Sequence, residues 1–290
     1  MAFNWNVFWT RAFTALVFVA VMLAGLLYSE WSFFILFSLL HFGCWHEYLM
    51  LMEKIYKHSF HAYTKIGISL LGFHVFLNFC NGLKLGPYLV RESFAVPILV
   101  VGVVFFVWGI FKQTTSIKQI GYTVLGVFYI SLPMGLLLYL RYSGAQFPII
   151  PEQGRLAVEN AGFYLPLLII AAIWVNDTMA YLVGSAIGRT PFSKISPKKT
   201  LEGTLGGIIC CVAAVTLILQ PFFDWHYLLG ISLVAALVGT GGDLLESKLK
   251  RMAGVKDSGT LLRGHGGFLD RFDSLLLAIP AVWILLVLAG

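Results

Sequence analysis

Long apolar runs recur along the whole chain, separated by short polar segments. A helix needs about 20 mostly apolar residues to cross roughly 30 Å of hydrocarbon. The runs are continuous, whereas the strands of a membrane β-barrel alternate over segments of about ten residues. The pattern therefore predicts an all-α, polytopic integral membrane protein with about nine transmembrane helices. The nine predicted spans are Ala12–Leu27, Trp31–Met52, Ile66–Gly82, Phe94–Phe111, Ile120–Leu140, Phe163–Ile187, Thr204–Leu219, Tyr227–Glu246 and Phe272–Ala289.

Composition strengthens the membrane assignment. Of the 290 residues, 59% are hydrophobic and only 12% are charged, and the mean hydropathy is +0.84. This is too apolar for a soluble fold of such a length. Because Arg11 precedes the first apolar run, that run could be a secretory signal. However, no small-residue cleavage pattern follows it and Trp31 opens the next span at once, so we expect a retained helix.

The chain shows no low-complexity tract, long linker or convincing internal repeat. We therefore treat residues 1–290 as a single membrane domain, in which residues 1–160 supply the N-terminal helices and residues 161–290 carry the motifs described below. The cysteines all fall in apolar windows without metal-type spacing, so they are interpreted as small buried hydrophobic residues. They are Cys44, Cys80, Cys210 and Cys211.

The basic residues are distributed unevenly over the predicted loops. With nine crossings, one side holds sixteen of the 20 lysines and arginines, and the other holds only Lys84, Arg91, Arg141 and Arg155. Since cytoplasmic loops carry the excess of basic residues, we expect the N-terminus and both polar clusters to face the cytoplasm. Topology and attraction to anionic lipid headgroups also explain the net charge of +6. No nucleic-acid-binding module occurs in the sequence.

Charge is concentrated just before the last span. Eleven of the 34 charged residues lie between positions 243 and 273. If the eighth helix continues into this segment, four polar residues at i, i+3, i+4 and i+7 share one stripe. They are Asp243, Glu246, Ser247 and Lys250. Asp270 and Asp273 are likewise i and i+3 at the start of the last helix, so two acidic stripes can meet near the membrane surface.

Carboxylates at such a depth are costly unless they are paired or bound to cations, which makes them functional candidates. Oxygen ligands beside basic residues suit Mg²⁺ that is shared with phosphate groups. The alternative is a set of structural ion pairs, such as Asp270 with Arg263. Both interpretations stay open at this point.

A glycine-rich loop, RGHGGFLDR, links the two stripes. Gly264, Gly266 and Gly267 remove side chains where the backbone must turn or approach another group, and they precede a helix N-terminus that favours phosphate oxygens. Neither a Walker A motif nor a GxGxxG fingerprint is present. The known phosphate loops of soluble proteins therefore do not explain this segment.

A second polar cluster lies between residues 174 and 207. Asp177 sits inside an apolar span, where it either serves the site or hydrogen-bonds neighbouring helices. The segment ISPKKT that follows offers hydroxyl donors and positive charge before the next span, and can therefore grip a polyphosphate. Its candidates are Ser196, Lys198, Lys199 and Thr200. For Ser196, which precedes a proline, a simple helix N-cap is the alternative.

At these two stretches the sequence closely resembles the CDP-diacylglycerol synthases, also called phosphatidate cytidylyltransferases. The family's upstream pattern is similar to Asp177–Tyr181 and Ile195–Gly203, and Glu47 in CWHEY is similar to a glutamate of its N-terminal half. Arg263 departs from a proline that family members often carry, and Thr178 and Met179 vary more mildly. The main signature is matched by Ser247, Lys250, Arg251, Lys256, Asp257, Gly259, His265, Gly266, Gly267, Asp270, Arg271 and Asp273.

The resemblance implies conversion of CTP and phosphatidate to CDP-diacylglycerol and pyrophosphate, with Mg²⁺ as cofactor, whether or not a second cation takes part. It also implies a bacterial inner membrane protein, in contact with membrane lipids, whose site faces the cytoplasm, and it suggests a homodimer. The phosphate of phosphatidate would attack the α-phosphorus of CTP. Because that nucleophile is already anionic, catalysis should consist mostly of charge neutralisation and positioning.

The resemblance also implies roles for individual residues. Asp243 and Asp270 are the first choices as metal ligands, with Asp273, Glu246 and Asp177 as further candidates. His265 either protonates or orients the pyrophosphate leaving group, or only satisfies the glycine loop. Lys198, Lys199, Lys250, Arg251, Lys256 and Arg271 would hold phosphate groups, Ser196 and Thr200 would donate hydrogen bonds, and Ser247, Gly266 and Gly267 would complete the substrate-binding set.

Two other functions remain open from the residues alone. A transporter or channel also carries buried acids near broken helices, but it would distribute polar residues through both halves, and here the first half offers chiefly Glu47. A CTP-dependent lipid kinase would cleave at the γ-phosphate and release CDP. The DGxxAR motif of the CDP-alcohol phosphotransferases is absent.

We predict that replacing Asp243 or Asp270 with asparagine abolishes turnover while the protein still folds in membranes. Asparagine keeps the shape of the side chain but removes the charge that a cation needs. The measurement is the rate of CDP-diacylglycerol formation by each purified variant. Full activity in either variant would defeat the assignment of that residue as a metal ligand.

Overall fold

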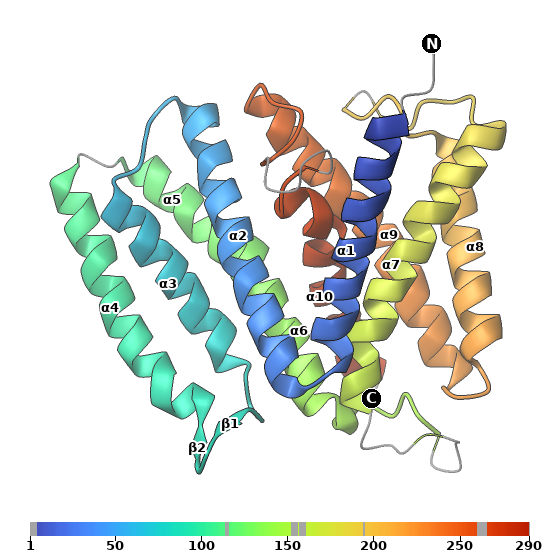
Figure 1. The fold of residues 1–290 in the computed structure, drawn as a ribbon, viewed down its shortest axis with the longest axis horizontal. Helices are drawn as coiled ribbons and strands as arrows, with labels where there is room; N and C mark the ends of the chain where they lie inside the picture. The colour runs from blue at the N-terminus through green and yellow to red at the C-terminus, as the bar shows by residue number, and fades with distance from the viewer. Residues whose placement is uncertain are drawn as a thin grey trace.

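The computed structural model of the chain describes residues 5–113, 116–151, 156, 161–193, 195–259 and 266–289. Within these residues the fold is helical, apart from a two-stranded antiparallel hairpin, β1 (Lys84–Leu85) and β2 (Tyr88–Leu89) (Figure 1). The helices are α1 (Trp5–Leu27), α2 (Glu30–Tyr56), α3 (Ala62–Asn78), α4 (Val90–Lys112), α5 (Ile117–Gly126), α6 (Leu132–Ser143), α7 (Ala161–Ile187), α8 (Leu201–Leu219), α9 (Trp225–Met252) and α10 (Leu269–Ala289).

The prediction of an all-α polytopic membrane protein is confirmed. In the described part of the chain, seven helices are long and apolar enough to cross a membrane. One of these runs through Ile117–Gln146, because the π-helical segment Val127–Ser131 joins α5 to α6 without a break. The two remaining predicted spans correspond to α1, whose described apolar part is Leu16–Leu27, and to the 17-residue α3.

The predicted third span was displaced by about one turn. The prediction ran from Ile66 to Gly82, whereas α3 begins at Ala62 and ends at Asn78. The His61 side chain accepts a hydrogen bond from the Tyr63 backbone N–H at 3.2 Å, which caps an earlier start. At the other end, the Cys80 N–H bonds to the Leu77 carbonyl at 2.9 Å in a turn that leads to the β-hairpin.

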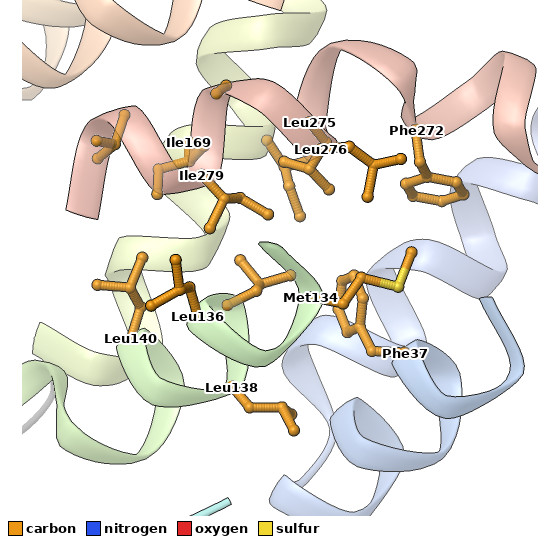
Figure 2. Packing of buried hydrophobic residues seen from close by; sticks show 14 of the residues in the cluster. Phe37, Met134, Leu136, Leu138, Leu140, Ile169, Phe272, Leu275, Leu276 and Ile279 are labelled. Carbon is orange, nitrogen blue, oxygen red and sulfur yellow. The ribbon is translucent and has the colours of Figure 1, made fainter. Parts of the chain in front are cut away.

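The helices form two groups that meet along α6 and α10. In Figure 1, the hairpin of α3 and α4 lies at one side, next to α5 and α2, and α7, α8 and α9 lie at the other. Figure 2 shows the packing where the groups meet. The buried residues labelled there are Phe37 of α2, Met134, Leu136, Leu138 and Leu140 of α6, Ile169 of α7, and Phe272, Leu275, Leu276 and Ile279 of α10.

Close van der Waals packing stabilises this arrangement, because lipid tails are as apolar as leucine and leave little hydrophobic drive between helices. Small residues allow the closest approaches. A Cβ at Gly207 of α8 would lie 2.7 Å from the Ala180 Cβ of α7, and one at Gly203 would lie 2.7 Å from the Ala180 carbonyl oxygen. The close packing therefore holds the polar end of α7 beside the polar start of α8.

Helix α9 continues to Met252, six residues beyond the predicted span. The predicted helical register of Asp243, Glu246 and Lys250 is therefore confirmed. The loop between α7 and α8, the end of α9 and the start of α10 all lie at the same end of the molecule as the start of α1 (Figure 1). The two polar clusters are thus brought to one face of the helix bundle.

Candidate active site

A cavity of about 540 Å³ opens between α7, α8, α9 and α10, where the two polar clusters meet. Its walls are mostly polar side chains, although the helices that carry them are apolar along most of their length. They include Asn176, Asp177, Ser185, Ser196, Lys198, Lys199, Thr200, Thr204, Thr240, Asp243, Asp270, Asp273 and Ser274. The structure therefore brings together residues that are up to about a hundred positions apart in the chain.

Four aspartates from three helices line this cavity: Asp177, Asp243, Asp270 and Asp273. Helices α9 and α10 come into close contact beside these acids, because a Cβ at Gly242 would overlap the Asp273 carbonyl oxygen. The cavity therefore collects four acidic side chains in a small volume. Acidic groups gathered in this way repel one another unless protons or cations lie between them.

Lysines compensate part of this negative charge. The Lys199 ammonium contacts Asp243, and both side chains are partly exposed in the cavity. The Lys250 ammonium lies 2.5 Å from Asp270 Oδ1 and also contacts Glu246. Lys199 is therefore placed where it can neutralise either a carboxylate or an incoming phosphate oxygen, whereas the buried Lys250 neutralises carboxylates.

Asp270 is held more firmly than the other three aspartates. Its Oδ2 accepts hydrogen bonds from the backbone N–H groups of Ser258 and Gly267, both at 2.8 Å, while Oδ1 faces Lys250. The structural ion pair that was the alternative for Asp270 is thus present, but with Lys250. Arg263, the partner that the sequence suggested, lies outside the described residues. The role of Asp270 as a metal ligand stays a prediction.

The segment before α8 forms a short closed loop that presents its lysines to the cavity. The Phe192 N–H bonds to the Lys199 carbonyl at 2.8 Å, and the Leu201 N–H bonds to the Thr190 carbonyl at 2.8 Å. Glu202 braces the loop from the first turn of α8, since it accepts hydrogen bonds from the Thr190 hydroxyl at 2.7 Å and from two backbone N–H groups. The loop geometry is therefore largely fixed by the chain itself.

The hydroxyl groups of this loop have distinct positions. Thr200 is the N-cap of α8, because its Oγ1 accepts a hydrogen bond from the Gly203 N–H at 3.1 Å. Ser196 lies before the helix and lines the cavity, so the alternative of Ser196 as the N-cap of this helix is wrong. Both hydroxyl groups remain candidates for contact with substrate.

Several predicted residues lie outside the walls of the large cavity. Glu246 is fully buried behind it against Lys250, and Ser247 is buried as well. Arg251 and Lys256 are exposed, and the Arg251 guanidinium donates to the Val255 carbonyl at 3.1 Å. These four positions are not brought into the cavity walls, and neither is Lys250, which was predicted to hold phosphate groups. Their roles stay predictions.

Arg271 lines a neighbouring crevice of about 130 Å³ between α1, α7 and α10. This crevice shares Asp177, Asp270 and Asp273 with the large cavity. Gly266 and Gly267 lie next to Asp270, and Gly266 has a φ of +80°, which favours glycine. His265 lies outside the described residues.

Sequence reasoning missed five polar residues of the cavity walls: Asn176, Ser185, Thr204, Thr240 and Ser274. Helical spacing was a signal that could have found two of them. Thr240 is three residues before Asp243 on α9, and Thr204 is four residues after Thr200 on α8. Short hydroxyl side chains inside apolar spans are common, however, so spacing alone would not have separated them from packing residues.

The aspartates fit Mg²⁺ as a cofactor that is completed by substrate. Among the described residues, no group of three or more acidic, histidine or cysteine side chains is arranged to hold a metal ion alone. Mg²⁺ usually takes one or two carboxylates together with phosphate oxygens and water. Asp177, Asp243 and Asp273, which line the same cavity, supply that kind of donor set.

Fold and site together define a polytopic membrane protein with a polar, charge-compensated cavity suited to phosphate groups. The sequence profile of the cytidylyltransferase family matches residues 9–289. The chain therefore belongs to the cytidylyltransferase family.

Individual relatives are similar over a shorter stretch. A phosphatidate cytidylyltransferase of Staphylococcus aureus is 40% identical over 156 residues, which cover 52% of this chain and 58% of that protein. The protein of the same name from Staphylococcus epidermidis is 43% identical over 134 residues, covering 44% and 51%. That from Staphylococcus saprophyticus is 39% identical over 156 residues, covering 52% and 58%. The chain thus spans little more than half the length of these relatives.

We predict that Glu202→Ala weakens nucleotide binding by loosening the loop that carries Lys198 and Lys199. The substitution removes the acceptor for the Thr190 hydroxyl and for the backbone of residues 189 and 190. The CTP concentration for half-maximal rate should rise at least about threefold, with a smaller effect on the maximal rate. Steady-state kinetics of the purified variant measure both quantities.

The matched control is Glu92→Ala. Glu92 is also an acid in the first turn of a helix, so both substitutions lose the same kind of interaction with the helix dipole. However, Glu92 lies at the start of α4, away from the loop that carries Lys198 and Lys199 (Figure 1). Equal effects of the two substitutions on CTP dependence would contradict a specific role of Glu202.

Proposed function

We propose that this chain transfers the cytidylyl group of CTP to phosphatidate, producing CDP-diacylglycerol and pyrophosphate. The observation that carries the proposal is the cavity itself, in which four aspartates and two lysines meet at one end of a bundle of apolar helices. Such a site can receive a charged nucleotide from water and a lipid headgroup from the bilayer. Membership of the cytidylyltransferase family and the names of the relatives support the same reaction.

The reaction is a displacement at phosphorus. A phosphate oxygen of phosphatidate forms a bond to the α-phosphorus of CTP, and the bond from that phosphorus to the bridging oxygen breaks. Pyrophosphate leaves with the bonding electron pair. Since nucleophile and leaving group are both anionic, the protein must chiefly neutralise charge and hold the groups in line.

Different residues of the cavity can neutralise the phosphate groups and position them. Lys198 and Lys199 lie on the loop before α8, where their ammonium groups can neutralise triphosphate oxygens. The hydroxyl groups of Ser196 and Thr240 can donate hydrogen bonds to the same oxygens. Lys250 holds Asp270 in place, and Arg271 adds positive charge on the side of the smaller crevice.

Mg²⁺, when bound, would add positive charge at the phosphate oxygens. Asp243 and Asp273 would hold it, with Asp177 nearby. Asp270 is a further candidate ligand, although its oxygens already have donors from Lys250, Ser258 and Gly267. Glu246 is a weaker candidate because it lies behind the cavity wall.

We also propose that the cavity faces the cytoplasm of a bacterial cell, from its inner membrane. The uneven distribution of lysines and arginines supports a position of the polar end of the bundle on the cytoplasmic side, where CTP is available. The bacterial relatives support a bacterial membrane. A homodimer and a single functional membrane domain belong to the same proposal and rest on the resemblance and on the absence of a linker in the sequence.

The deciding experiment gives the purified, detergent-solubilised protein phosphatidate, Mg²⁺ and CTP labelled at either the α- or the γ-phosphate. The proposal expects the α-label to appear in the lipid and the γ-label in pyrophosphate. A lipid kinase would instead transfer the γ-label to the lipid and release CDP. Absence of α-label from the lipid under all conditions of divalent ion would contradict the proposal.

We predict that Lys199→Glu raises the CTP concentration for half-maximal rate at least about tenfold, equivalent to roughly 1.4 kcal/mol of binding. The new carboxylate would face Asp243, which Lys199 now contacts, and would repel the triphosphate. Lys248→Glu is the matched control, because this exposed lysine of α9 undergoes the same charge change without lining the cavity. Unchanged CTP dependence in Lys199→Glu would remove that residue from the site.

A further inference from the structure

Glu47 is a buried carboxylate in the middle of α2, far in sequence from either motif, and only 3% of it is exposed. It contacts the glycine-rich segment that precedes α10. Its Oε1 accepts a hydrogen bond from the Phe268 N–H at 2.8 Å, and its Oε2 accepts one from the Leu269 N–H at 2.8 Å. Helix α2 therefore supplies the side chain that caps α10.

This contact removes two free-energy penalties of burial, one for the helix N-terminus and one for the carboxylate. The first N–H groups of a helix have no partners within the helix, and leaving them buried without acceptors is unfavourable. A buried carboxylate is equally unfavourable unless donors surround it. The N-terminus of α10 also carries a partial positive charge, so an anion there is stabilised. Glu47 and the start of α10 thus satisfy each other.

A single hydroxyl group connects Glu47 to Asp270. Ser258 Oγ lies 2.7 Å from Glu47 Oε2 and 2.9 Å from Asp270 Oδ2. The hydroxyl carries one hydrogen and therefore donates to only one carboxylate at a time. The Ser258 backbone N–H also donates to Asp270 Oδ2 at 2.8 Å. Any shift of Glu47 is therefore transmitted through Ser258 to Asp270.

The glycines around this contact leave room for Glu47. A Cβ at Gly259 or at Gly267 would overlap the Glu47 carboxylate, and neither residue has a positive φ. Gly266 is different, since its φ of +80° needs glycine in any case, and a Cβ there would meet Asp270. The absence of side chains at positions 259 and 267 is thus explained by the carboxylate of α2.

We infer that Glu47 is a positioning residue for the site: by capping α10 and holding Ser258, it sets the place of the Asp270 carboxylate beside Lys250. The part that Asp270 plays in turnover rests on the proposed function. The geometric part does not, because it concerns only how α2, the loop and α10 fit together. The inference is therefore tested in two ways: by the thermal stability of substituted proteins and by their enzymatic activity.

The test without activity is a cycle of substitutions followed by thermal unfolding in detergent. Gly267→Ala should lower the unfolding temperature by several degrees in the wild-type chain, because its Cβ meets the Glu47 carboxylate. In a Glu47→Ala background that carboxylate is gone, so Gly267→Ala should lower the temperature by less than half as much. Gly254→Ala is the matched control, because its cost comes only from a φ of +69° and a Cβ there meets nothing within 4 Å, so it should be the same in both backgrounds.

The test with activity compares Glu47→Gln and Glu30→Gln at a temperature well below unfolding. Glutamine replaces one acceptor oxygen by an NH₂ group, which cannot accept from an N–H of α10. The turnover number of Glu47→Gln should fall about tenfold or more, while the CTP concentration for half-maximal rate stays within about twofold, because the loop of Lys198 and Lys199 is untouched. Glu30, an exposed residue at the other end of α2, serves as the control.

Equal costs of Gly267→Ala in the two backgrounds would overturn the inference. So would a Glu47→Gln protein that unfolds at a lower temperature but keeps its turnover number, since that is the result of a purely structural role.

If Glu47→Gln does not fold, Ser258→Ala decides instead, because it removes the hydroxyl that joins the two carboxylates. Loss of turnover with unchanged CTP dependence supports the inference, and unchanged turnover overturns it. A wild-type protein without transferase activity would contradict the proposed function alone, and the unfolding cycle would still test the contact.

Discussion

The acids of this membrane protein depend on charge compensation inside a bundle of apolar helices. Glu246 is fully buried and the Asp270 side chain is only 10% exposed, which is tolerable because the Lys250 ammonium contacts both. Separating charges at this depth costs several kcal/mol per ion. The lysine thereby ties α9 to α10, and the cavity walls follow from that pairing.

Compensation is incomplete on the side of the cavity that faces substrate. Asp243 has Lys199 as a neighbour, but Asp177 and Asp273 line the same cavity without a lysine contact of their own among the described ion pairs. This leaves a place where additional positive charge is stabilised, next to lysines that stabilise additional negative charge. Under the proposed function, a nucleotide that arrives with a divalent cation would satisfy both requirements.

The two halves of the chain share the work of building the site. Residues 161–290 provide the cavity walls, while the N-terminal half contributes the packing surface of α6 against α10 (Figure 2) and the carboxylate of Glu47. The same α10 receives the packing on one side and the cap at its first turn. Its acidic first turn is therefore held by contacts with helices that come more than a hundred residues earlier in the chain.

The sequence by itself determined the helical membrane fold, most span boundaries, the register of Asp243, Glu246 and Lys250, and the acidic and basic candidates of both motifs. These features depend on local hydropathy and on helical periodicity, and both are properties of residues that are close together in the sequence. Only the tertiary structure decided which candidates meet. It turned Glu246 and Ser247 away from the cavity, paired Asp270 with Lys250, added Thr240 and Asn176 to the walls, and brought Glu47 to the start of α10. Those outcomes depend on how helices rotate and approach one another, and neighbouring residues along the sequence do not encode that geometry.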